Sequence, residues 1–119
     1  MSETIVKFLK VLKAELEELL EDIDLVERRA ADRLARMEIT EYVYKANDGL
    51  LRLESEAIRE LLSSIDGIDA ALYKSLDELV AELDRSAGNL VRDHEDPEAV
   101  YRFFKRKLAK VRRYVESGD

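Results

Sequence analysis

The only histidine of the chain, His94, lies among acidic residues and is the first candidate for chemistry. Asp93, Glu95 and Asp96 flank it, and an imidazole with carboxylates can bind a metal ion or transfer a proton. All four residues are neighbours in the sequence, however, whereas a coordination sphere or a catalytic pair usually draws on separate segments. We therefore predict a surface histidine whose pKa is raised by its acidic neighbours, and no metal site.

Seven carboxylates between residues 15 and 27, with no basic residue among them, form a second candidate. Metal sites in helical bundles use inward-pointing Glu residues together with Glu-x-x-His pairs. Here the positions that face inward carry Leu16, Leu19, Ile23 and Val26. The carboxylates occupy flanking and outer positions, so we predict a solvated acidic surface. They are Glu15, Glu17, Glu18, Glu21, Asp22, Asp24 and Glu27.

Other signals for catalysis are missing from the sequence. There is no cysteine to act as a thiolate nucleophile or a zinc ligand. None of the serines lies in a Gly-x-Ser-x-Gly turn, and the four glycines form no phosphate-binding loop. We expect a non-enzymatic protein with no catalytic residue, no metal and no cofactor.

A strongly basic segment near the C-terminus is the sharpest feature of the sequence. Residues 97–119 contain seven basic and three acidic residues, a formal charge of +4, whereas residues 1–96 contain 13 basic and 24 acidic residues, a charge of −11. Four of the cations recur at helical spacing and line one stripe roughly opposite the apolar face, as residues that contact phosphates do. This basic stripe, a candidate for binding a polyanion or a partner, is Arg102, Arg106, Lys110 and Arg113.

The same stripe has a second interpretation, in which it faces protein. A basic helix is attracted to the acidic surface of the first helix, either within one chain or across a dimer. We favour this interpretation over nucleic-acid binding, because the negative charge of the remaining chain repels a long polyanion.

The positions of glycine and proline predict long helices, because residues 1–48 contain neither. Apolar residues recur at alternating steps of four and three from Ile5 to Ala30, and Met37 keeps the same register. This heptad pattern predicts one helix from Ser2 to Met37, with Ser2 as its N-cap.

The segment 39–53 fits two structures. Five strand-forming residues lie between positions 39 and 44, and Asn47-Asp48-Gly49 is a turn signal, so a β-hairpin is the alternative here. The four-three spacing of apolar residues continues across that turn signal, and an isolated hairpin is only marginally stable in water. We therefore predict a second helix, which closes at Ser63–Gly67.

A third helix follows this boundary. Asp69 is its predicted N-cap, and its apolar stripe is Leu72, Leu76, Leu79, Leu83, Ala87 and Leu90.

A fourth helix follows the segment His94–Pro97. Asp96 can cap it, Pro97 suits its first position, and its apolar stripe extends the helix to about Glu116.

The length of the first helix carries the prediction about assembly. At 1.5 Å per residue it should extend about 54 Å, whereas a compact domain of this size is roughly 35 Å across. Part of its apolar face then has no partner within the chain, and we predict a homodimer in which these helices pair across a two-fold axis. The alternative is a monomer in which a bend near residues 22–24 folds the helix back. The candidate dimer seam is Leu9, Leu12, Leu16, Leu19, Ile23 and Val26.

Length and composition set the class of protein. A chain of 119 residues that is 46% hydrophobic and 39% charged fits one folded helical domain spanning residues 1–119. No apolar run approaches the roughly 20 residues of a membrane span, and the first residues do not resemble an export signal, so we expect a cytoplasmic protein without membrane contact. The absence of Gln and the many Glu, Lys and Arg residues are typical of proteins from hot environments.

These features predict an all-α, elongated four-helix bundle with one long N-terminal helix. The function they favour is that of a homodimeric interaction, scaffold or adaptor module that recognises another protein. A nucleic-acid-binding protein that uses the basic stripe is the alternative.

Overall fold

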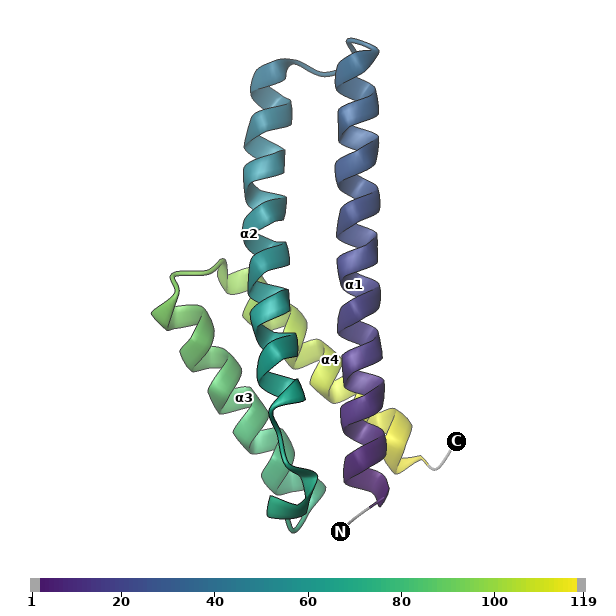
Figure 1. The fold of residues 1–119 in the computed structure, drawn as a ribbon, viewed down its shortest axis with the longest axis vertical. Coiled ribbons are helices and arrows are strands. Elements are labelled where there is room, and N and C mark those ends of the chain that lie inside the picture. The colour runs from purple at the N-terminus through teal and green to yellow at the C-terminus, as the bar shows by residue number, and fades with distance from the viewer. Residues whose placement is uncertain (1–2, 118–119) are drawn as a thin grey trace.

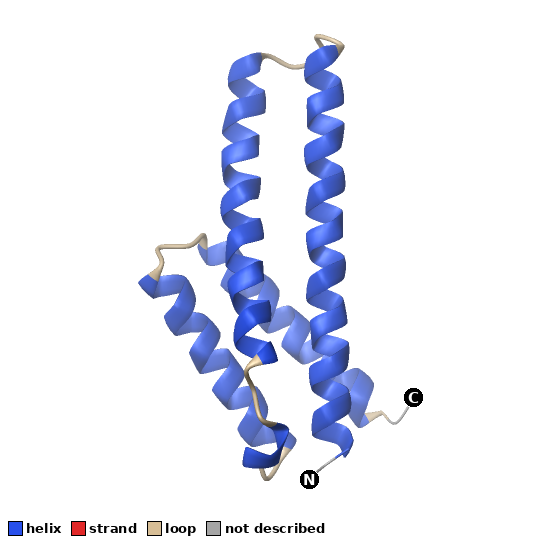
Figure 2. Cartoon of the chain, viewed as in Figure 1, coloured by secondary structure: helices blue, strands red, loops and turns tan. Residues whose placement is uncertain are grey.

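The computed structural model describes residues 3–117, which form four α-helices (Figures 1 and 2). They are α1 (Glu3–Ala35), α2 (Glu41–Asp66), α3 (Leu76–Asp93) and α4 (Glu98–Glu116), with a short 3₁₀ helix, η1 (Ala70–Leu72), before α3. These residues contain no strand. The predicted all-α, elongated four-helix fold is confirmed.

Helix α1 runs without interruption for 33 residues. The bend near residues 22–24 that a folded-back monomer requires is absent, since these residues continue the helix. The predicted N-cap, Ser2, lies outside the described residues. At the other end the helix stops two residues before Met37, where the sequence pattern had placed its end.

A left-handed residue ends α1. Met37 has a φ of 62°, its N–H donates to the carbonyl oxygen of Leu34 at 3.0 Å, and the N–H of Glu38 donates to that of Arg33 at 2.8 Å. This is the Schellman arrangement, which usually places glycine at the left-handed position. Because the sequence has Met37 at this position instead of glycine, it gave no local indication that the helix ends here.

Helix α2 begins at a side-chain cap rather than a strand. The hydroxyl oxygen of Thr40 accepts a hydrogen bond from the N–H of Val43 at 3.2 Å, which satisfies one of the free donors at the start of a helix. The hairpin alternative for residues 39–53 is therefore wrong, and the helix continues through Asn47-Asp48-Gly49 to Asp66, with Gly67 as its C-cap.

Gly49 provides a test of this helical register. A Cβ atom added there would meet nothing within 4 Å, and alanine is preferred over glycine inside a helix by roughly 0.5–1 kcal/mol. We expect Gly49→Ala to raise the free energy of unfolding by about this amount in urea denaturation. Destabilisation would contradict a helix at this position.

Helix α3 begins later than the sequence suggested. Asp69 caps η1 instead, where its carboxylate accepts from the N–H of Ala71 at 3.0 Å, and the prediction that it caps the third helix is wrong. The cap of α3 is Ser75, whose hydroxyl accepts from the N–H of Glu78 at 3.2 Å. Leu72, expected in the apolar stripe of this helix, is 72% exposed.

The start of α4 corrects a second cap. Pro97 occupies the cap position and no side chain caps this helix, so the prediction that Asp96 caps it is wrong. The preceding turn has the Schellman arrangement again: Glu95 has a φ of 53°, and the N–H of Asp96 donates to the carbonyl oxygen of Val91 at 2.9 Å.

The hydrophobic core lies in the half of the molecule that contains α3 and α4. There α1 contacts α2 and α4, and α4 contacts α3, while α1 and α2 stand side by side along the long axis (Figure 1). The buried hydrophobic residues are Ile5, Phe8, Leu12, Leu16, Ile23, Ala57, Ile58, Leu61, Ile65, Leu79, Leu83, Ala87, Val91, Val100, Phe104, Leu108, Val111 and Val115.

The other half of the molecule is a two-helix projection. The molecule measures 55 × 33 × 19 Å with a radius of gyration of 16.7 Å, whereas a compact domain of this length has a radius of gyration of about 13.5 Å. The radius of gyration is larger because the C-terminal end of α1 and the N-terminal end of α2 extend beyond α3 and α4 (Figure 1). None of the helices in residues 3–117 has the length and hydropathy that crossing a bilayer requires.

Candidate interaction surfaces

The predicted dimer seam is divided between the core and the surface. Leu12, Leu16 and Ile23 are buried within the chain, and Leu9 and Leu19 are half-buried against the same core. Only Val26, at 47% exposure, is open to a second chain. Helices α2 and α4 therefore cover the seam up to Ile23, and its uncovered part begins at Val26.

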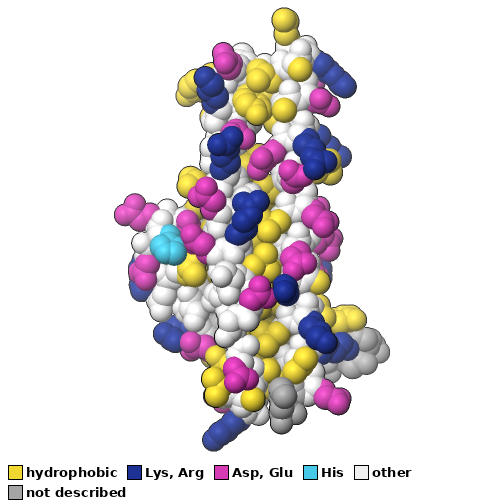
Figure 3. All heavy atoms as spheres, viewed as in Figure 1, with side chains coloured by type: hydrophobic (Ala, Val, Ile, Leu, Met, Phe, Trp, Pro, Cys, Tyr) yellow, Lys and Arg dark blue, Asp and Glu magenta, His cyan; other side chains and the backbone are white. Residues whose placement is uncertain are grey.

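An apolar surface without a partner in the chain continues from Val26 to the tip. Val26, Val43 and Leu50 are 47%, 42% and 50% exposed, and hydrophobic side chains gather between α1 and α2 towards the tip in Figure 3. A hollow of about 620 Å³ lies among them. We call its apolar lining the distal surface: Val26, Ala30, Ile39, Val43, Leu50 and Leu51.

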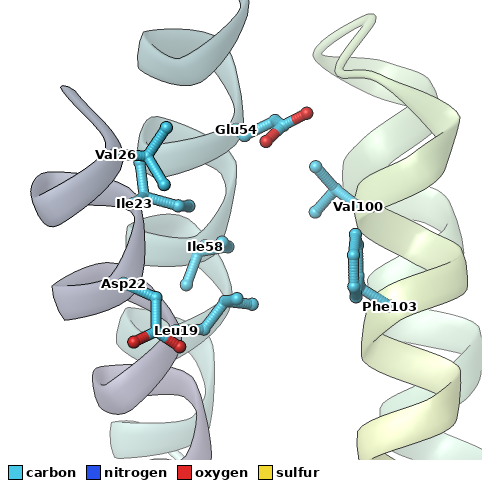
Figure 4. Close-up of a pocket in the computed structure, with 8 residues that line it drawn as sticks. All are labelled: Leu19, Asp22, Ile23, Val26, Glu54, Ile58, Val100 and Phe103. Carbon is cyan, nitrogen blue, oxygen red and sulfur yellow. The ribbon is translucent and has the colours of Figure 1, made fainter. Parts of the chain in front are cut away.

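A second hollow, of about 220 Å³, lies between α1, α2 and α4 and shares Val26 with the first. Val100 and Phe103 of α4 face Ile23 and Val26 of α1 across it (Figure 4). Helix α4 thus closes off the proximal end of the apolar groove, and the distal end stays open.

Charges along the projecting end are mixed and nearly balanced. Residues 24–54 contain six basic and seven acidic residues. Several pair along one helix, such as Asp24 with Arg28 at 2.6 Å and Asp48 with Arg52 at 3.0 Å. The residues around the distal surface therefore carry charges of both signs, and these charges nearly cancel.

The predicted basic stripe lies on α4, but its members have different surroundings. Arg102 pairs with Glu98 one turn earlier at 3.4 Å, and the Arg106 guanidinium lies 5.4 Å from the ring centre of Phe103. Lys110 pairs with Glu15 of α1 at 2.6 Å. Arg113 borders a shallow hollow of about 460 Å³ together with Arg106 and Lys110.

Glu15 anchors α4 to α1. Its carboxylate accepts from Lys107 at 3.1 Å and from Lys110 at 2.6 Å, and its side chain is only 16% exposed. These hydrogen bonds, from Lys110 first and then Lys107, hold the pKa of the Glu15 carboxyl below its usual value. The contact that we expected between the basic helix and the acidic side of the first helix is present within the chain. The sequence did not single out Glu15 among the seven clustered carboxylates as the one that pairs with α4.

The pair gives stability a defined pH dependence. Because the folded-state pKa of Glu15 is lowered, its contribution is complete above the unfolded pKa of about 4.3–4.5 and is lost as the pH falls through the folded value. We expect Glu15→Gln to lower the free energy of unfolding by about 1 kcal/mol at pH 7. The difference from the parent protein should vanish in acid, as measured by urea denaturation between pH 7 and pH 3.

Glu21→Gln is the matched control, because Glu21 is exposed on the same helix and takes part in no ion pair found in the described residues. Equal losses in the two variants would contradict a specific role for Glu15.

His94 has a partner that the sequence did not reveal. Its Nδ1 atom lies 2.7 Å from Oε2 of Glu60 on α2. The hydrogen bond that the His94 ring donates to the Glu60 carboxylate is the first cause of the raised pKa of His94, and the charges of Asp96 and Asp93 add to it. The predicted direction was right, but the main cause is a residue 34 positions away. Nothing in the sequence indicated that α2 packs against this turn.

Comparison of the chain with models of protein families, with curated proteins and with solved structures found no match. The function therefore has to be inferred from the surfaces themselves.

Proposed function

We propose that this protein is a non-enzymatic helical interaction or scaffold module that acts as a homodimer through its distal surface. The observation that carries the proposal is the exposure of Val26, Val43 and Leu50 along a two-helix projection that no other part of the described chain covers. An apolar strip of this kind on an otherwise charged molecule is typical of a protein–protein contact.

A second copy of the chain is the occupant that suits this surface best. Two helices with one apolar face form half of a four-helix bundle, and two such hairpins complete it. Residues 24–35 and 41–53 provide roughly three turns of each helix for this contact. A two-fold axis brings the same surface of both copies together, and the balanced charge of residues 24–54 avoids strong repulsion between the copies.

The position of α4 supports one direction of approach for the two copies. Val100 and Phe103 of α4 occupy the proximal end of the groove, so a partner helix can enter only from the tip. The two molecules then overlap at their tips and run in opposite directions, with the two cores at the far ends.

Light scattering over a range of concentrations tests the homodimer. We expect the mass of two chains at about 100 µM protein and a shift towards one chain on dilution. A mass of one chain throughout that range would overturn the proposal.

Cysteine cross-linking tests the location of the contact, since the chain contains no cysteine of its own. Asn47→Cys places a thiol at the lining of the distal hollow, and Glu21→Cys places one on the exposed side of proximal α1. We expect an oxidised dimer from the first variant only. Cross-linking of the Glu21→Cys variant alone would place the contact elsewhere.

Binding of nucleic acid by α4 is the second candidate function. It is supported by the hollow that Arg106, Lys110 and Arg113 border, and it is weakened by the pairing of Lys110 with Glu15. Exchange of Arg102, Arg106 and Arg113 for Glu should abolish a salt-dependent shift of labelled DNA or RNA. Absence of any shift from the parent protein at about 50 mM salt would end this candidate.

A further inference from the structure

Three potential metal ligands meet where α2 passes the turn between α3 and α4. They are Glu60, His94 and Asp96, and one ligand atom from each lies within 4.8 Å of the others. Within this group, Nδ1 of His94 and Oε2 of Glu60 are 2.7 Å apart. The spatial separation that the sequence-adjacent acids around His94 lack is therefore supplied by Glu60.

The turn between the helices holds two of these ligands in place. Glu95 adopts a left-handed conformation, and the backbone of Asp96 is fixed by its hydrogen bond to Val91. Val91 before the turn and Val100 after it are both buried in the core. His94 and Asp96 are thus presented to Glu60 by backbone that is anchored on both sides.

One carboxylate oxygen of this cluster lacks a partner. Oδ2 of Asp96 is buried and has no hydrogen-bond partner in the described chain. Burying an acceptor without a donor costs about 1–3 kcal/mol, so a native structure normally provides a bonding partner or an ion. This oxygen is a second observation beside the proximity of the three residues, and it is an acceptor that a bound cation or a shared proton would satisfy.

The cluster brings two carboxylates close to one imidazole. Burial first, and then the negative charge of Glu60, raise the pKa of the Asp96 carboxyl, whereas the positive charge of His94 lowers it; a hydrogen bond with Glu60 and the charge of Glu56 add smaller upward contributions. Glu60 and Asp96 are thus two carboxylates in one small space, next to an imidazole and with the charge of Asp93 nearby. Either a shared proton or a bound metal ion relieves their repulsion.

We propose that Glu60, His94 and Asp96 bind a divalent transition-metal ion of the zinc type. Imidazole and carboxylate together suit Zn²⁺, Fe²⁺ or Ni²⁺, whereas Mg²⁺ and Ca²⁺ prefer oxygen ligands alone. Ligands with bonds of about 2.1 Å to one ion lie roughly 3.0–3.4 Å from each other. The Nδ1 atom of His94 and Oε2 of Glu60 are slightly closer than this, and all three ligand atoms lie within 4.8 Å of one another, so small side-chain movements suffice.

The site is open to solvent on one side. The side chains of His94 and Glu60 are 52% and 40% exposed, which leaves room for water molecules to complete the coordination. The ion would tie α2 to the turn between α3 and α4, and it would stabilise the folded chain by linkage. It does not involve the distal surface, so the proposal stands apart from the homodimer.

Calorimetric titration of the untagged full chain with Zn²⁺ alone tests the site. At about pH 7.5 we expect one ion per chain and a rise in the midpoint of thermal unfolding. His94→Gln, Glu60→Gln and Asp96→Asn should each weaken binding at least about tenfold. Glu95→Gln is the matched control, because it changes a carboxylate within the same turn that is not a ligand, and it should bind Zn²⁺ like the parent chain.

A second measurement keeps the test independent of whether the variants fold. The chain has a single histidine, so its imidazole gives one set of NMR signals, and these should shift with the first equivalent of Zn²⁺. No binding at about 1 mM Zn²⁺, or binding that leaves the imidazole signals and the His94→Gln variant unaffected, would overturn the proposal. The cluster would then be a carboxyl pair that shares a proton.

Discussion

Replacing Phe104 by alanine should lower the free energy of unfolding by about 3–5 kcal/mol. Phe104 lies on α4 with only 2% of its surface exposed, in the same core as Phe8 of α1. Removing a buried aromatic ring loses its transfer free energy and leaves a cavity that the neighbouring helices fill only in part. Because a domain of this size is stable by about 5–15 kcal/mol, the loss should be plain in urea denaturation followed by circular dichroism.

Phe103→Ala is the control for this experiment. Phe103 is the preceding residue on the same helix, yet it is 44% exposed, so we expect a loss of about 1 kcal/mol or less. The two variants remove the same group from adjacent positions and differ only in which face of α4 they change. Equal losses, or a larger loss at Phe103, would contradict the register in which α4 packs on α1 and α3.

The combined variant Val43→Glu and Leu50→Glu should convert the proposed dimer to a monomer. Both side chains belong to the distal surface and are about half exposed in the single chain, so the substitutions leave the core untouched. In a dimer they would bury four carboxylates without partners, which is strongly unfavourable. We expect the dissociation constant to rise at least about a hundredfold while the helical content is preserved.

Tyr42→Glu is the matched control for the dimer. Tyr42 adjoins Val43 on α2 and is 83% exposed, but it does not line the distal hollow. This variant adds one negative charge to the same helix, half of the charge that the combined variant adds, and should keep the mass of a dimer in light scattering. A dimer that survives the combined variant would place the contact on another surface.

The helices themselves could be predicted because their signals are local. The four-three spacing of apolar residues across Gly49 outweighed the turn signal there, since apolar packing and the Thr40 cap both favour a helix. The start of α3 was predicted too early, although Ser75 and Glu78 have the spacing of a capping box. Asp69 is also a good cap residue and comes earlier in the chain, but the helix it begins is the short η1.

The sites were harder to predict because they depend on which elements meet. Glu60 and His94 come together only through the packing of α2 against the turn that follows α3, and no spacing in the sequence records that contact. The length of α1 correctly indicated an uncovered apolar region. It could not locate that region, because α2 and α4 both pack along α1 and leave Leu12 and Leu16 buried.

Helix α1 begins and α4 ends at the same end of the molecule, opposite the tip (Figure 1). Any domain or label fused to either terminus would therefore sit on the far side from the distal surface. With each chain 55 Å long and the tips overlapping by about 20 Å, the fused cargoes of a tip-to-tip pair would be held roughly 90 Å apart. Such a pair would act as a molecular spacer whose reach is set by rigid helices rather than by a flexible linker.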